Sequence, residues 1–214
     1  MNVLVIGANG QIGRHLVSQL KENPGHTVRA MVRKQEQLEA LDKSGIEAVL
    51  ADLEGTVEEL AEAMKGNDAI VFTAGSGGST GADKTLLIDL DGAVKTMEAA
   101  EKAGISRYLM VSALYAEDRT KWPESIKPYY VAKHYADKWL ANSSLNYTII
   151  RPGGLKNEPG NGKVSLNPEA GASSIPREDV AAVIVAALDA DNTYRKAFPI
   201  VSGTESINEV IEQI

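Results

Sequence analysis

Short apolar runs alternate along the chain with longer amphipathic stretches, and this alternation limits the folds that the sequence can adopt. Because the runs are apolar without interruption, we expect strands that are buried on both faces, as in a parallel sheet covered by helices. The predicted fold is α/β, a doubly wound parallel sheet in a three-layer αβα arrangement. The predicted strands are residues 3–6, 27–32, 48–50, 69–73, 108–112 and 147–150.

The stretches between these strands show the i, i+3, i+4 apolar spacing of helices. Gly45, Gly66 and Gly104 stand where three of them should end, positions that favour the left-handed backbone of glycine. After Arg151 the rhythm changes to a loop-rich stretch, which we expect to form a small C-terminal, substrate-side appendage on a single domain. The predicted helices are residues 11–22, 35–44, 57–65, 86–103, 130–142 and 177–188, with a late strand at 197–201 and a short helix after it.

The composition excludes several kinds of site. A formal net charge of −7 argues against nucleic-acid binding, which needs clustered basic residues. The chain has no Cys and three isolated His, so we expect no metal site, and the absence of thiols fits a cytoplasmic location. No apolar run approaches the roughly 18 residues that a membrane-spanning helix needs, and the first residues lack signal-peptide features. We therefore expect a soluble protein whose N-terminus belongs to the fold.

A glycine-rich turn directly follows the first predicted strand and opens the first predicted helix. In this setting Gly7 permits a tight turn, Gly10 lets the backbone approach a diphosphate, and Gly13 lets the helix pack close to the strand. The N–H groups of Gln11 and Ile12 would point at the phosphates from the positive end of the helix dipole. The turn predicts dinucleotide binding, with a turn that binds nothing as the alternative. Its predicted binding residues are Gly7, Asn9, Gly10, Gln11, Ile12 and Gly13.

A second glycine-rich segment, with Gly75, Gly78 and Gly81, follows the fourth predicted strand. About ten residues separate Thr73 from the next helical pattern, which favours a flexible active-site loop over a plain surface loop. Thr73, Ala74 and Gly75 are expected to contact the cofactor.

The end of the second predicted strand indicates which dinucleotide binds. An acidic residue there would accept hydrogen bonds from the ribose of NAD, whereas this strand ends on Arg33 and Lys34. Two cations suit a 2′-phosphate, so we expect NADP(H) rather than NAD(H); the alternative is that both are merely solvated. Asp52 and Leu53 follow the third strand, where the adenine ring would lie.

Tyr129 and Lys133 stand four residues apart at the start of a predicted helix and share one face. Reduction of a carbonyl needs a proton donor, and an adjacent cation lowers the pKa of a tyrosine toward neutrality. Ser112, at the end of the fifth predicted strand, would hydrogen-bond the substrate oxygen. In the alternative reading Tyr129 only packs at the helix start, Lys133 is solvated, and Tyr130 is the packing or functional residue.

These residues resemble the short-chain dehydrogenase/reductase superfamily, in particular its atypical, epimerase/dehydratase-like members with a Rossmann fold. The resemblance implies that Pro152 and Gly153 contact the nicotinamide. It also places Asp89 where many relatives have a catalytic Asn. For Asp179 it implies either a structural role, bracing the fold, or a catalytic one. The motifs that carry the resemblance are Gly7-x-x-Gly10-x-x-Gly13, Ser112, Tyr129-x-x-x-Lys133, residues 147–155 and residues 176–181.

The predicted function is that of an NADP(H)-dependent oxidoreductase acting on a small carbonyl or quinone-like substrate. A non-catalytic NADP(H)-binding redox sensor and a small-substrate epimerase or dehydratase are the alternatives. A homodimer formed through the helices at 86–103 and 130–142 is possible, although their apolar faces are equally explained by packing on the sheet.

Overall fold

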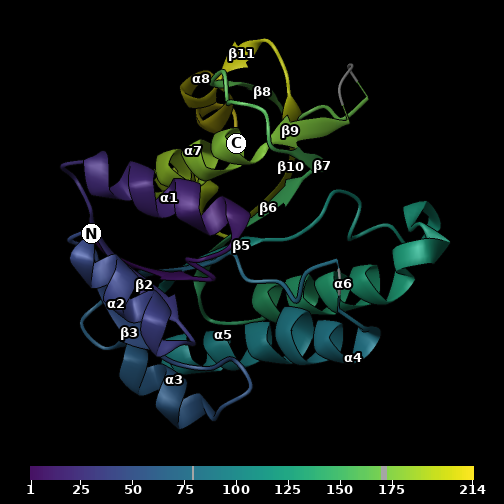
Figure 1. The fold of residues 1–214 in the computed structure, drawn as a ribbon. Helices are drawn as coiled ribbons and strands as arrows, with labels where there is room; N and C mark the ends of the chain where they lie inside the picture. Colours follow the sequence, from purple (N-terminus) through teal and green to yellow (C-terminus); the bar gives the residue numbers. More distant parts are fainter. Residues whose placement is uncertain (79, 170–172) are drawn as a thin grey trace.

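A nine-stranded sheet forms the centre of the protein in the computed structural model, which describes residues 1–78, 80–169 and 173–214 (Figure 1). The central strands run parallel in the order β3-β2-β1-β4-β5-β6-β10, and β8 and β11 extend the β10 edge antiparallel. The predicted α/β fold is therefore confirmed. The parallel strands are β1 (Asn2–Ile6), β2 (Thr27–Val32), β3 (Glu47–Leu50), β4 (Ala69–Phe72), β5 (Arg107–Val111), β6 (Asn146–Pro152) and β10 (Lys196–Ser202).

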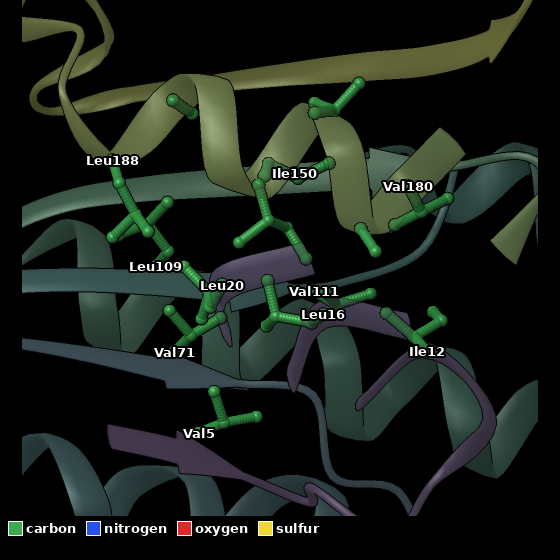
Figure 2. Close-up of a cluster of buried hydrophobic side chains, with 14 of the residues drawn as sticks. Val5, Ile12, Leu16, Leu20, Val71, Leu109, Val111, Ile150, Val180 and Leu188 are labelled. Carbon is green, nitrogen blue, oxygen red and sulfur yellow. The ribbon is translucent and has the colours of Figure 1, made fainter. Parts of the chain in front are cut away.

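Helices cover both faces of this sheet and enclose two apolar cores. Helices α1 (Gln11–Glu22), α7 (Arg177–Leu188) and α8 (Ile207–Glu212) cover one face, and α3 (Val57–Met64), α5 (Ala93–Lys102) and α6 (Lys127–Ala141) cover the other. Helix α2 (Gln35–Lys43) follows β2 and contributes to the first core. Figure 2 shows that core, where strand residues Val5, Val71, Leu109, Val111 and Ile150 meet Ile12, Leu16 and Leu20 of α1 and Val180 and Leu188 of α7.

Alternate residues of the inner strands enter different cores, as the uninterrupted apolar runs predict. Val3 and Val5 of β1 face the α1 side, and Leu4 and Ile6 face the α3 side. Strand β3 departs from the prediction, because it lies at the sheet edge and no residue of it is fully buried.

The predicted helix at 86–103 begins earlier and changes its geometry along its length. It starts at Ala82 as α4 (Ala82–Lys84), continues as a π-helix, η1 (Thr85–Gly92), and returns to α-helical geometry in α5. Uninterrupted π-helical geometry is rare and is often found at functional sites. Apolar spacing alone does not distinguish these helix types, so the sequence could not predict the change.

Short strands interrupt the stretch after Arg151 that was predicted as loops. Strand β7 (Gly154–Lys156) pairs with β9 (Ser174–Pro176), and β8 (Lys163–Ser165) pairs with β10 and β11 (Glu205–Ser206). Part of this C-terminal third also completes the main core, because β10 extends the sheet and α7 packs on α1.

Arg107 connects this C-terminal part to the sheet. Its buried guanidinium donates from β5 to Thr148 on β6, to the carbonyl of Ala187 on α7 and to the hydroxyl of Thr193 in the short 3₁₀-helix η4 (Asp191–Thr193). The ring of Tyr194 lies 4.3 Å from the guanidinium carbon.

Several exposed large apolar residues gather on adjacent segments. Leu86 and Leu87 lie on η1, and Tyr135 and Trp139 lie on α6, which packs against η1. A homodimer through these segments stays a prediction. Within the described ranges, no helix is both long and apolar enough to cross a membrane.

Candidate functional site

The turn between β1 and α1 is built for close approach of a ligand. Gly7 has φ +84°, and a Cβ there would lie 2.6 Å from the backbone nitrogen of Ala74; a Cβ on Gly13 would collide with the carbonyl of Gly7. Gly10 is the N-cap of α1, with no side-chain cap and no acidic residue in the first turn. The first N–H groups of α1 are therefore available to an anion, and the turn fits a diphosphate.

Arg14, which the sequence did not single out, places a cation beside this turn. Its Nε and Nη2 donate to Oδ1 of Asn9 across 3.2 and 2.8 Å, and both residues are exposed. Asn9 is thus a positioning partner of Arg14 within the predicted site. The position of Arg14 on the first turn of α1 is the signal that could have indicated it.

Arg33 and Lys34 are exposed at the carboxyl end of β2, and Lys34 is the N-cap of α2. Neither forms an ion pair within the described part of the chain. Asp52 is also exposed, and its Oδ1 accepts the N–H of Glu54 across 3.0 Å. Leu53, in contrast, is buried against Gly92, so Asp52 presents the only exposed side chain of the pair.

The loop after β4 lies against the glycine turn. The hydroxyl of Thr73 donates to the carbonyl of Ile6 across 3.0 Å, and Ala74 packs on Gly7. Gly75 lies beside the carboxylate of Asp89 on η1. The structure therefore brings Thr73, Ala74 and Gly75 next to the predicted diphosphate site.

The predicted Tyr129, Lys133 and Ser112 lie together at the carboxyl end of β5. The Nζ of Lys133 donates to the carbonyl of Val111 across 3.3 Å and lies 5.7 Å from the centre of the Tyr129 ring. Ser112 is 2% exposed, and its hydroxyl lies beside the carboxylate of Asp137. A buried hydroxyl at this end of the sheet is placed to donate a hydrogen bond to a substrate oxygen.

The acid–base properties of Tyr129 differ from the prediction. Burial raises the pKa of Tyr129; Lys133 lowers it, as predicted, but the charges of Asp89 and Asp137 act with burial. Burial lowers the pKa of Lys133, yet Tyr129, Asp89 and Asp137 outweigh it, so the net shift is upward. The tyrosine is therefore held as a neutral phenol beside a lysine cation.

Asp137 and Arg151 belong to the same cluster, although the sequence had not indicated them. Burial raises the pKa of the Asp137 carboxyl, against the opposing effects of Arg151, Ser112 and Lys133. Asp137 stands four residues beyond Lys133, on the same face of α6, and this spacing was the available signal.

Tyr130 takes the packing role that the sequence left open. Its ring lies 6.1 Å from that of Trp122 and 5.7 Å from that of Tyr129. Asp179 is a brace, since its carboxylate accepts the N–H groups of Asn161 and Gly162.

Pro152 is the last residue of β6 and Gly153 follows it, and both are buried. The carbonyl of Pro152 accepts the N–H of Leu114, and the N–H of Gly153 donates to Ile200. A Cβ on Gly153 would collide with the carbonyl of Ser173, so this glycine is needed for packing.

The sheet order and the glycine turn define a dinucleotide-binding protein of the Rossmann type. The model of the NAD(P)H-binding family matches residues 7–191, and the chain belongs to this family.

Similar proteins carry epimerase and reductase names. The chain is 59% identical, over the full length of both proteins, to YhfK of Bacillus subtilis (strain 168), named an uncharacterized sugar epimerase. A solved structure from Bacillus halodurans, named as a candidate NAD-dependent epimerase/dehydratase, is 46% identical with a TM-score of 0.92, and both chains are fully covered. ChuY, an anaerobillin reductase from Escherichia coli O157:H7, is 26% identical with a TM-score of 0.81, covering 94% of this chain and 97% of that one.

Proposed function

We propose that the protein is an NADP(H)-dependent oxidoreductase that transfers hydride between the nicotinamide and a small carbonyl or quinone-like substrate. The observation that carries this proposal is the grouping of Tyr129, Lys133 and the buried hydroxyl of Ser112 at the same sheet edge as the glycine turn. A purely dinucleotide-binding domain has no need of a buried hydroxyl beside a phenol and an ammonium group.

The residues of this chain would divide the binding of NADP(H) among them. The glycine turn and the first N–H groups of α1 would hold the diphosphate, and Arg33 and Lys34 would hold the 2′-phosphate. Pro152 would border the part of the site that holds the nicotinamide. When bound, the reduced cofactor supplies a hydride.

The side chains supply the proton and the orientation. Ser112 donates a hydrogen bond to the substrate oxygen, and Tyr129 gives its phenolic proton to that oxygen as the alcohol forms. The raised pKa of Tyr129 suits this role, because the phenol stays protonated near neutral pH. Lys133 then stabilises the phenolate that is left.

The test is NADPH oxidation against a panel of small carbonyls and quinones, with Tyr129→Phe as the decisive variant. The matched control is Tyr130→Phe, which removes the hydroxyl of the neighbouring tyrosine, whose ring packs on Trp122. We expect Tyr129→Phe to lose at least about 100-fold in kcat/KM and Tyr130→Phe to remain close to the wild type. Equal activity in both variants would remove Tyr129 from the mechanism, and tight NADPH binding without turnover by the wild type would favour a redox sensor.

The name of the 59% identical relative favours epimerase activity as a second candidate. Tyr129 could take the hydroxyl proton of a hydroxylated substrate while the same carbon gives its hydride to the oxidised cofactor. Return of both to the opposite face would yield the epimer, with no net consumption of cofactor. Incubation with small sugars in deuterated water, with the cofactor monitored by absorbance, separates the two. Interconversion of isomers at constant cofactor absorbance indicates an epimerase.

A further inference from the structure

Asp89 is a carboxylate that is buried within a π-helix. It is 1% exposed and lies in the π-helix η1, four residues after Thr85, which is buried as well. Because a π-helix widens the turn, these two polar side chains reach the loop after β4 from neighbouring positions.

The two carboxylate oxygens of Asp89 bind different parts of the site. Oδ1 lies 3.4 Å from Nζ of Lys133, and Oδ2 accepts the backbone N–H of Ser76 across 2.9 Å. The hydroxyl of Ser76 is 3.3 Å from that of Thr85. The loop after β4 is therefore held by η1 at the residue that follows Gly75.

Both partners of Asp89 are donors, and this fixes the chemistry that the position needs. The ammonium group of Lys133 and the N–H of Ser76 each require an acceptor. A carboxylate offers two, whereas an amide offers one oxygen and turns its NH₂ group toward the remaining donor. An Asn could satisfy the loop or the lysine but not both.

We propose that Asp89 is a positioning residue that holds Lys133 beside Tyr129 and, with its second oxygen, fixes the cofactor-side loop at Ser76. This inference rests on the proposed reaction and deepens it. One carboxylate then contacts both the loop and the lysine of the Tyr129–Lys133 pair.

The charges around the pair determine what removal of Asp89 does. Tyr129 and Asp137 face Lys133 from α6 and Asp89 faces it from η1. Arg151 on β6 compensates Asp137 and is itself paired with Glu117, which lies in the segment after β5. Asp89 is the carboxylate bound directly to the lysine, so neutralising it makes the first proton easier to lose from the coupled pair.

The first experiment titrates tyrosines labelled with ¹³C at Cζ by NMR, with the Tyr129 signal assigned from Tyr129→Phe. We expect Asp89→Asn to ionise the pair at least about one pH unit below the wild type. Thr85→Val, which also removes a partner of Ser76 but no charge, should titrate as the wild type does. An unshifted Asp89→Asn, or an equal shift in Thr85→Val, overturns the proposal.

The second experiment measures hydrogen exchange of a peptide covering residues 73–78. Asp89→Leu keeps the branched shape of the side chain and has no acceptor, so we expect exchange at Ser76 to be about tenfold faster or more, with unchanged protection of β5 showing that the fold is kept. Unchanged exchange at Ser76 overturns the loop contact. If Asp89→Leu does not fold, the titration of Asp89→Asn still decides the proposal.

Neither measurement needs turnover. A wild type that oxidises no NADPH with any substrate defeats the proposed reaction, while the titration and the exchange still report on Asp89. If turnover is found, the alkaline limb of kcat/KM for reduction should move to lower pH in Asp89→Asn and stay in place in Thr85→Val.

Discussion

The Nε of Arg151 donates to Oδ2 of Asp137 across 2.9 Å, and both side chains are largely removed from solvent. Strand β6 and helix α6 are thus joined by a charge pair directly behind the residues proposed for proton transfer. Asp89 is paired with Lys133, and Asp137 is paired with Arg151, which also pairs with the half-exposed Glu117. Each buried carboxylate of this cluster therefore has a cationic partner.

Removal of Arg151 should unbalance this cluster. Arg151→Met leaves Asp137 buried and unpaired, and we expect a loss of about 3 to 5 kcal/mol in the free energy of unfolding, measured by urea denaturation. Adding Asp137→Asn to the Arg151→Met variant should restore part of the lost free energy of unfolding. The exposed Arg119→Met is the control, and a single variant as stable as this control would contradict the prediction.

The pH dependence of alcohol oxidation should reveal the raised pKa of Tyr129. Oxidation needs the phenolate, so log kcat/KM should rise by one unit per pH unit and keep rising beyond about pH 10, the ordinary pKa of tyrosine. Reduction needs the protonated phenol and should stay constant over the same range. A plateau of the oxidation rate near neutral pH would show instead that Lys133 lowers the pKa of Tyr129 more than burial raises it.

Cofactor preference should depend on Arg33. Arg33→Ala is expected to weaken NADPH binding about tenfold or more while leaving NADH binding unchanged, because only NADPH carries a 2′-phosphate. Fluorescence titration measures both dissociation constants. Lys163→Ala, an exposed cation on β8 near the opposite edge of the sheet, is the control. An unchanged NADPH constant in Arg33→Ala would disprove the assignment.

Gly7 should tolerate no side chain. Its φ of +84° and the 2.6 Å approach of a Cβ to Ala74 lead us to expect that Gly7→Ala lowers the free energy of unfolding by more than about 2 kcal/mol and abolishes dinucleotide binding. Gly78→Ala, where a Cβ meets open space, is the matched control. Equal thermal stability of the two variants would argue against the turn described here.

Local patterns predicted the sheet and most helices well. The range 11–22 of α1 follows from the glycine turn before it and from apolar residues at helical spacing, and α7 follows from Pro176 and the same spacing. The short strands β7 and β9 were missed because each has only three residues. Those of β7 are exposed and those of β9 are partly or fully buried, and neither strand forms an apolar run.

The site was predicted less completely, for physical reasons. Tyr129, Lys133 and Ser112 could be found because each has a recognisable residue type at a strand or helix end. The partnership of Asp137 with Arg151 depends on how α6 packs on β6, which neither segment encodes alone. The direction of the pKa shift of Tyr129 depends on burial, which spacing to Lys133 does not report.

The buried contacts of Arg107 bear on how the chain is synthesised. Its partners Ala187 and Thr193 are translated 80 or more residues after it, so a nascent chain that ends before them leaves Nη2 of this buried guanidinium without its acceptors. We therefore expect the contacts of this central strand to be completed only when almost the whole chain has emerged from the ribosome. A protein shortened before Thr193 should consequently depend on chaperones or be degraded, even though the glycine turn and the tyrosine helix would both be present in it.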